Sequence, residues 1–205
     1  LSPALQNPLK LGADIVIHST TKYINGHSDV VGGAVIAKKK ETFDKINFWA
    51  NNLGLTGAPF DSYLTLRGLR TLSLRMKTHE KNAAALAQVL SNNKKVKTVY
   101  YPGLEHHSSH EIAKKQQNGF GGMLSFELKG GLPAVKKFFK KVKHFSLADS
   151  LGGFESLVCH PYTMTQAPLT DKEKEFSGIT QGLIRISAGL EDIDDLISGL
   201  KKGLD

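Results

Sequence analysis

Two short apolar runs stand out in the N-terminal part of the chain. Residues 14–18 form the first run, after Gly12, and residues 33–37 form the second. An uninterrupted apolar run of this length, bounded by glycine or polar residues, is typical of a strand that is covered on both faces. The pattern therefore predicts two buried strands with a polar segment between them.

A longer stretch, from Phe60 to about Asn92, has apolar residues at the spacing of an amphipathic helix. Either Asp61 or Ser62 is placed to cap its N-terminus. The pattern predicts one long helix or two joined helices, with these apolar positions: Tyr63, Leu66, Leu69, Leu72, Met76, Ala83, Leu86, Ala87 and Leu90.

Strand and helix patterns alternate over the rest of the chain. Strands are expected at residues 96–101, 123–128 and 183–187, and helices at residues 112–117, 133–142 and 193–204. We therefore place a domain boundary near residue 90. Residues 1–90 are predicted to be the C-terminal part of a larger α/β domain, and residues 91–205 a small α+β domain.

The composition narrows the class of protein. With 205 residues and 40% hydrophobic content, the chain is long enough to bury one large core or two modest ones. Its apolar runs span only a few residues, whereas a membrane-spanning helix needs about 20, so we expect no membrane span. No signal-peptide pattern is present, and the single cysteine, Cys159, cannot form an internal disulfide. These features favour a cytoplasmic protein. Because the first residue is leucine, we also expect a longer reading frame.

The formal net charge of +8 raises the question of nucleic-acid binding. The lysines are spread along the chain, however, and between residues 134 and 143 they alternate with apolar residues, as on the solvent face of a helix. We therefore expect no nucleic-acid partner, and the charge favours the attraction of anionic small molecules. A non-catalytic fragment that binds polyanions or acts in assembly is the alternative from another functional class.

The tetrapeptide Ser19, Thr20, Thr21 and Lys22 follows the first predicted strand. In extended backbone, Ser19 and Thr21 face the same side and would present two hydroxyls to a phosphate. A lysine that is partly desolvated behind a buried strand is suited to form an imine with an aldehyde. Pyridoxal phosphate has both a phosphate and an aldehyde. Taken alone, the tetrapeptide also fits an ordinary turn between a strand and a loop.

The sequence around this tetrapeptide, residues 11–34, is LGADIVIHSTTKYINGHSDVVGGA. It resembles the lysine segment of the Cys/Met-metabolism family of pyridoxal-phosphate enzymes. The resemblance is greatest to the cystathionine γ-synthases and γ-lyases of that family. It implies an α/β fold, namely the PLP-dependent transferase fold of the aspartate-aminotransferase type, and a homotetramer built as a dimer of dimers. It extends over essentially the whole chain, including residues 51–57, 60–63, 66–72, 119–126, 150–157 and 183–187.

The resemblance implies roles for individual residues at the cofactor. Lys22 matches the lysine that forms the Schiff base with pyridoxal 5'-phosphate, and it is the expected catalytic residue. Ser19 and Thr21 match the hydroxyls that bind the cofactor phosphate.

Other positions match the substrate site of the family. Ser150 and Arg185 correspond to residues that bind the substrate carboxylate, and Thr165 corresponds to a hydroxyl near the cofactor. Arg185 suits this role because a guanidinium binds a carboxylate with two parallel hydrogen bonds. Two positions depart from the family pattern: Asp149 stands where glutamate is common, and Gln166 stands where histidine is usual. We expect Asp149 to influence substrate specificity.

The reaction that the resemblance implies is γ-replacement on an activated homoserine ester, with cysteine as the thiol and cystathionine as the product. The first alternative is the γ-elimination of cystathionine by a γ-lyase. A β-lyase is third, because Leu151 stands where the β-lyases of the family tend to carry an aromatic residue. Small amino acids are the expected substrates in each case.

The resemblance also implies that the chain holds only about half of the family's sequence. The expected partner is therefore the N-terminal half of the same enzyme, which carries the family's ring-stacking aromatic and the carboxylate that pairs with the pyridine nitrogen. We expect the chain by itself to be inactive.

Two further groups of residues have weaker patterns. His106, His107 and His110 lie in a polar segment without a second pair of ligands at metal-binding spacing, so we expect no metal site. Cys159 and His160 are adjacent, and adjacent residues of a strand face opposite ways, so a buried thiol is expected rather than a nucleophile with its base.

Overall fold

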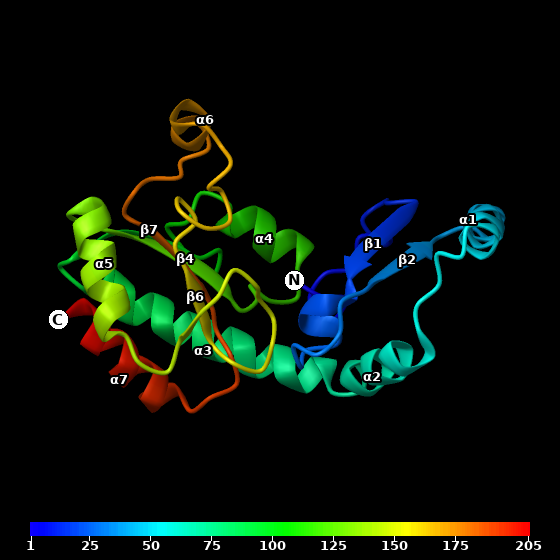
Figure 1. Cartoon of the computed structure of the whole chain (residues 1–205), viewed down its shortest axis with the longest axis horizontal. Coiled ribbons are helices and arrows are strands. Elements are labelled where there is room, and N and C mark those ends of the chain that lie inside the picture. Colours follow the sequence, from blue (N-terminus) through cyan, green and yellow to red (C-terminus); the bar gives the residue numbers. More distant parts are fainter.

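The computed structural model describes all 205 residues, which form two regions (Figure 1). The N-terminal region, blue to cyan in the figure, ends near residue 71, and the long helix α3 leads from it into the second region. The N-terminal region contains β1 (Ile15–Ser19), the single π-helical turn η1 (Thr20–Ile24), β2 (Gly33–Ala37), α1 (Lys40–Asn52) and α2 (Pro59–Leu69).

Strands β1 and β2 pair antiparallel, with Ile15 opposite Ala37 and Ser19 opposite Gly33. Both strands were predicted, but the prediction that they are buried is wrong. Val16 is the only residue of the two strands that is buried, and Ile17 is 76% exposed. The reason is that other parts of this chain cover this two-stranded sheet only in part, which an apolar run in the sequence does not reveal.

The helices of the N-terminal region were predicted in part. The stretch that starts at Phe60 forms two joined helices, α2 and α3 (Leu72–Ser91), which separate at Arg70 and Thr71. Proline at the start of α2 suits the first turn, where the missing N–H has no helical partner. Helix α1 was not predicted and contains no buried residue.

The second region is built on a five-stranded sheet with the order β3-β4-β7-β6-β5. All neighbouring strands are antiparallel except β5 and β6, which are parallel. The strands predicted at residues 96, 123 and 183 are confirmed, whereas the two short strands at the edge were not predicted. The strands are β3 (Val96–Tyr100), β4 (Met123–Leu128), β5 (Ser146–Leu147), β6 (Leu157–Cys159) and β7 (Leu183–Ser187).

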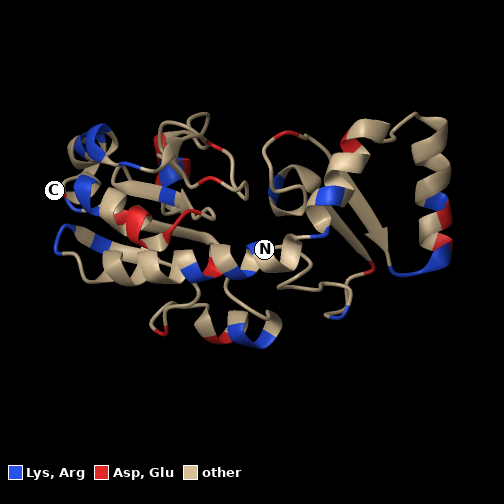
Figure 2. Ribbon diagram, turned by 90° about the horizontal axis from the view of Figure 1, so that it is seen from below, with Lys and Arg blue, Asp and Glu red and all other residues tan.

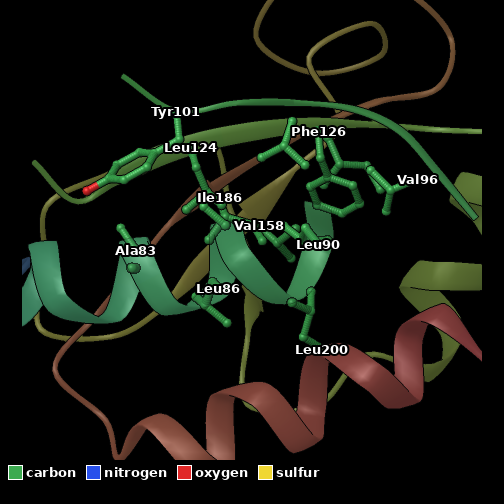
Figure 3. Packing of buried hydrophobic residues seen from close by; sticks show 14 of the residues in the cluster. Ala83, Leu86, Leu90, Val96, Tyr101, Leu124, Phe126, Val158, Ile186 and Leu200 are labelled. Carbon is green, nitrogen blue, oxygen red and sulfur yellow. The ribbon is translucent and has the colours of Figure 1, made fainter. Parts of the chain in front are cut away.

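Helices cover one face of this sheet. Helix α3 packs on β3 and β4, α5 (Gly131–Lys141) packs on β4 and β7, and α7 (Ile193–Leu204) packs against both helices. Their apolar side chains meet those of the strands in one core cluster of 20 buried residues (Figure 3). The predictions of α4 (His110–Gln116), α5 and α7 are confirmed. The short helix α6 (Asp171–Phe176), which begins with a Thr170–Glu173 capping box, was not predicted.

The distribution of charged residues and the hydropathy of the helices can be described along the whole chain. Lysines and arginines are distributed over both regions rather than gathered in a single stripe (Figure 2). No helix combines the length and the apolar character that crossing a bilayer requires.

Candidate active site

Lys22 lies in a tight turn at the end of β1. The strand ends at Ser19, and the backbone then winds into η1, with Asn25 N donating to Thr20 O and Gly26 N donating to Lys22 O at 2.8 Å. Lys22 itself has non-helical dihedral angles, φ −92° and ψ −134°. The expectation of an extended segment from Ser19 to Thr21 holds for Ser19 and is wrong for Thr20 and Thr21, because hydrogen bonds of a helical turn hold the backbone from Thr20 onward.

The side chain of Lys22 contacts the second region of the molecule. Its Nζ donates a hydrogen bond of 3.0 Å to Ser150 Oγ, although the two residues are 128 positions apart. Gly152, in the same loop as Ser150, has a φ of +78°, and a Cβ at this position would lie 2.7 Å from Tyr23 N. Only glycine combines this backbone conformation with such close packing. The loop after β5 therefore lies directly against the turn that carries Lys22.

Arg185 reaches the same loop from β7. Ile184 and Ile186 point into the core, so the alternation of a strand directs Arg185 to the opposite face of the sheet, away from the helices. Arg185 Nη2 donates to Asp149 O at 2.8 Å and to Ser150 O at 3.0 Å. Ser150 thus accepts hydrogen bonds from Lys22 through its hydroxyl and from Arg185 through its carbonyl.

The two hydroxyls expected at a cofactor phosphate differ in their surroundings. Thr21 Oγ1 accepts a hydrogen bond from Gly32 N at 3.0 Å and lies 3.3 Å from Gly32 O. Ser19 is exposed, and its hydroxyl makes no hydrogen bond within the chain. Ser19 is therefore free to bind a ligand, whereas Thr21 also joins η1 to the segment before β2.

The side chains of the remaining predicted residues make no hydrogen bond to Lys22, Ser150 or Arg185. Asp149 is exposed, and only its backbone carbonyl contacts Arg185. Thr165 and Gln166 are half-buried in the turns between β6 and α6, and the Thr165 hydroxyl makes no hydrogen bond to Lys22, Ser150 or Arg185. The structure thus brings together Lys22, Ser150 and Arg185, and it does not bring Thr165 into hydrogen-bonding contact with them.

Cys159 ends β6, opposite Arg185 on β7, and His160 follows it. No group of three or more His, Cys, Asp or Glu side chains is arranged to hold a metal ion. Cys159 is buried on β6, and burial raises the pKa of its thiol, which keeps the sulfur protonated. The His160 ring contacts Thr163 Oγ1 and Gln181 O, at 2.9 and 3.1 Å.

Three residues that the sequence analysis did not single out hold the site together. Ser187 Oγ accepts a hydrogen bond from Gly152 N at 3.0 Å and fixes the Ser150 loop to β7. Tyr23 is buried under the lysine turn, and burial raises its pKa to about 12. Arg75, on α3, donates to the Tyr23 carbonyl at 2.7 Å. A tyrosine next to the lysine and an arginine among apolar helix positions are the sequence signals of these contacts.

The residues present fit pyridoxal phosphate. The Lys22 amine is half-buried and oriented by Ser150, and a Schiff base needs an amine held in this way. A hydroxyl without a partner, that of Ser19, lies three residues before Lys22, at the end of β1. Lys22, Ser19 and Thr21 would hold the cofactor, and Ser150 and Arg185 flank the amine on the side of the second region.

Comparison with known sequences gives close relatives over the whole chain. Cystathionine gamma-synthase of Escherichia coli is 53% identical over 203 residues, which cover 99% of this chain and 53% of the relative. L-methionine gamma-lyase of Fusobacterium nucleatum is 51% identical over 210 residues, covering all of this chain and 52% of the relative. Proteins named cystathionine gamma-lyase and cystathionine beta-lyase match to similar extents. The chain spans about half the length of these relatives.

Comparison with solved structures gives the same family. The crystal structure of cystathionine gamma-synthase from Xanthomonas oryzae pv. oryzae, in complex with aminoacrylate and cysteine, superposes with a TM-score of 0.96 and 55% identity. It covers 100% of this chain, which in turn covers 53% of that protein. The sequence model of the family described as "Cys/Met metabolism PLP-dependent enzyme" matches residues 1–205. The chain therefore belongs to the Cys/Met metabolism family of PLP-dependent enzymes.

Proposed function

We propose that this chain supplies the Schiff-base lysine and the substrate-carboxylate site of an enzyme that catalyses γ-replacement on an activated homoserine ester. One observation carries the proposal: Ser150 accepts a hydrogen bond from Lys22 Nζ at 3.0 Å and another from Arg185 Nη2 at 3.0 Å. An amine for proton transfer and a guanidinium for a carboxylate are thus held beside one residue.

The cofactor, when bound, supplies an electron sink for carbanion chemistry at the amino acid. The chain's own residues supply the positioning and the proton transfer. Arg185 Nη1 and Nε, which make no hydrogen bond to an oxygen of the chain, are available to the substrate carboxylate. Lys22 Nζ would be the base that takes a proton from the substrate and returns it. Ser150 Oγ accepts from Lys22 and so orients its amine.

Phosphate binding is assigned to Ser19 and Thr21. The Ser19 hydroxyl has no competing partner in the chain, so it can donate fully to a phosphate oxygen. Thr21 Oγ1 is already held by Gly32, which fixes its position before the cofactor binds. The nearby positive charges of Lys22 and Arg185 favour an anionic substrate.

The choice of cystathionine synthesis over cleavage rests on the relatives. The Xanthomonas oryzae pv. oryzae enzyme was solved in complex with aminoacrylate and cysteine, and separately with cystathionine. Because cysteine and cystathionine are the thiol substrate and the product of γ-replacement, we favour this reaction for the present chain. Elimination from cystathionine by a γ-lyase is the second candidate, because relatives with that name match the same residues.

The activity also requires sequence beyond this chain. The relatives are about twice as long, and the apolar side chains of β1 and β2 in this chain are largely uncovered. We propose that the half of the relatives that this chain does not match covers these strands and supplies the remaining groups around the pyridine ring. "The complete enzyme" below means this chain together with that half, and we propose that it assembles as a homotetramer.

Product analysis tests the proposed reaction. The complete enzyme is given O-succinylhomoserine with cysteine, and in a separate reaction cystathionine alone. We expect cystathionine from the first mixture at a rate that exceeds the cleavage of cystathionine in the second. Faster cleavage in the second mixture would make the protein a lyase. In Asp149→Glu, we expect the ratio of replacement to elimination to change, because the exposed Asp149 carboxylate lies beside the carbonyl that Arg185 binds.

A further inference from the structure

Helix α3 carries a row of buried polar side chains within its apolar face. Arg75, His79 and Asn82 are only 7%, 0% and 3% exposed. They are four and three residues apart, so they lie on one side of the helix, in line with the buried Met76 and Ala83. Each of the three donates hydrogen bonds to backbone carbonyls of segments far away in the sequence. We call this row the α3 polar row.

Arg75, at the N-terminal end of the row, holds the turn that carries Lys22. Its Nη1 donates to Tyr23 O at 2.7 Å, and its Nη2 donates to Ile24 O at 3.3 Å and to Gly68 O at 2.8 Å. Carbonyls at the end of a helical turn lack helical partners and carry a partial negative charge, so a cation is suited to them. The guanidinium also fills the space beside Gly26, where a Cβ would collide with it.

His79 and Asn82, at the other end of the row, hold the segment that follows β7. His79 Nδ1 contacts Ala188 O at 2.6 Å, and Asn82 Nδ2 donates to Gly189 O and to Glu191 O, both at 3.0 Å. A carbonyl only accepts hydrogen bonds, so His79 carries a proton on Nδ1. Burial lowers the pKa of His79, which keeps the ring neutral in this tautomer.

The helix between these ends is a spacer of fixed length. Seven residues of α-helix span about 10.5 Å, and a packed helix does not stretch appreciably. One end of the row is bonded to the residues immediately after Lys22, and the other end is bonded to the residues immediately after the strand that carries Arg185. The row therefore determines where the Lys22 turn lies relative to β7.

We propose that Arg75, His79 and Asn82 are positioning residues that set the placement of Lys22 relative to Arg185. This inference rests on the proposed function, because it gives that placement a role in the reaction. None of the three side chains contacts Lys22 Nζ or the Arg185 guanidinium. They act through the backbone. Ser150 bonds to both groups, and it can do so only when the Lys22 turn and the segment after β7 keep their relative positions.

The first experiment measures backbone hydrogen exchange in the complete enzyme without cofactor, so its result does not depend on catalysis. Arg75→Met keeps the aliphatic stem and removes the donors, and Asn82→Leu removes the donors at the other end. We expect Arg75→Met to increase exchange at least about tenfold in residues 20–26, because an open turn loses roughly the stabilisation of one or two hydrogen bonds. Asn82→Leu should instead affect residues 186–191. The matched control is Lys81→Met on the exposed side of α3. Unchanged exchange in residues 20–26 of Arg75→Met would overturn the proposal.

The second experiment separates positioning from mere stabilisation by kinetics. We expect Arg75→Met to reduce kcat for cystathionine formation at least about tenfold, because it frees the turn that carries the Lys22 amine. We expect Asn82→Leu mainly to raise KM, because it loosens the segment after the strand that carries Arg185. In the double variant, the fold-reduction in kcat/KM should be smaller than the product of the two single reductions. Each single variant already disturbs the placement of Lys22 relative to Arg185, so the second substitution adds less. Arg75→Lys should recover part of the loss by keeping a cation at the carbonyls.

The outcomes distinguish this inference from the proposed function. Loss of thermal stability with unchanged kcat and KM in both variants would make the row structural and overturn the inference. Strictly multiplicative effects in the double variant would also overturn it. A wild-type enzyme that binds the cofactor but forms no cystathionine would instead contradict the proposed function, and the exchange experiment would still test the row.

Discussion

The two regions of the molecule differ sharply in how they bury apolar side chains. The second region has a cluster of 20 buried residues between its sheet and helices, whereas the small cluster that includes Leu5 and Tyr23 has 4. Most of the large exposed apolar residues, including Ile17, Phe48, Trp49 and Leu55, belong to the N-terminal region. Lys22 thus lies in the region whose apolar side chains are largely exposed in this chain, and Arg185 lies in the region with the large core.

This difference separates two requirements of the site. The well-packed sheet gives Arg185 a fixed position on β7, because Ile184 and Ile186 are anchored in the core. The turn around Lys22 combines the small apolar cluster at Tyr23 with hydrogen bonds from Ser150, from Arg75 and within its own backbone. The strand that carries Arg185 is therefore fixed by the large core, whereas the turn that carries Lys22 depends on a small cluster and on directed hydrogen bonds.

The largest expected effect is that of Lys22→Ala. In the complete enzyme, this variant should lose the visible absorbance of the bound cofactor and reduce turnover by about 10³-fold or more, because the base and the Schiff-base amine are removed together. Absorbance spectra and steady-state rates measure both. Ser150→Ala serves as a comparison, since it removes only the acceptor of the Lys22 amine and should keep the absorbance. An unchanged spectrum of Lys22→Ala would contradict the assignment.

The difference in packing predicts unequal effects of the same substitution. In this chain alone, Leu86→Ala in the core should lower the free energy of unfolding by about 2–5 kcal/mol. Leu55→Ala should change it by only about 0.5 kcal/mol or less, because Leu55 is 72% exposed. Urea unfolding at low protein concentration measures both values. Equal losses of unfolding free energy in the two variants would contradict the difference in packing between the two regions.

Arg185→Lys should affect the use of the substrate, whereas Ser19→Ala should affect the binding of the cofactor. Arg185→Lys should lower kcat/KM by roughly 10- to 100-fold, because an ammonium does not reproduce the two parallel bonds to a carboxylate, and it should leave the cofactor affinity unchanged. Ser19→Ala should weaken cofactor binding by about 1–3 kcal/mol, and Thr21→Ala should do likewise. Cofactor titrations and substrate kinetics on the same preparations measure these effects. If cofactor binding persists unchanged in both hydroxyl variants, their phosphate role is wrong.

The smallest expected effect is a pH dependence of stability. Burial lowers the pKa of His79 in the folded protein below the unfolded value of 6.5, so the unfolded state binds the proton first as the pH falls. The contribution of a neutral His79 is therefore complete above pH 6.5 and decreases as the pH falls below it. Burial raises the pKa of Tyr23 from 10.0 to about 12, so stability should also fall between these values as the pH rises. Unfolding measured across pH, with His79→Leu expected to flatten the acidic slope, checks the sign.

Elements with a clear apolar pattern could be predicted whether or not this chain buries them, as β1 and β2 show. The apolar spacing of α3 placed Leu86 on the apolar face of a helix, and the strand expected at residues 183–187 is β7; both predictions are confirmed. The burial of β1 was predicted wrongly, because an apolar run does not reveal what covers it. The two-residue strand β5 is too short for a periodic pattern.

The candidate site could be predicted residue by residue only through the family resemblance. That resemblance pointed to Lys22, Ser150 and Arg185, which the structure brings together. The spacing of α3 leaves a gap in the apolar pattern at His79, and this gap was the available signal for the polar row. Its partners are backbone carbonyls, which have no signature in a sequence, so the contacts of Arg75 and His79 required the structure.

The most direct test of the central claim identifies the lysine that binds the cofactor. The complete enzyme with pyridoxal phosphate is reduced with borohydride, digested and analysed by mass spectrometry, with untreated enzyme as the reference. The account predicts that the reduced cofactor is attached to the peptide containing Lys22 in near-stoichiometric amount and to no other lysine at a comparable level. Attachment to a different lysine, or an unmodified Lys22 peptide in an enzyme that forms product, would contradict the account.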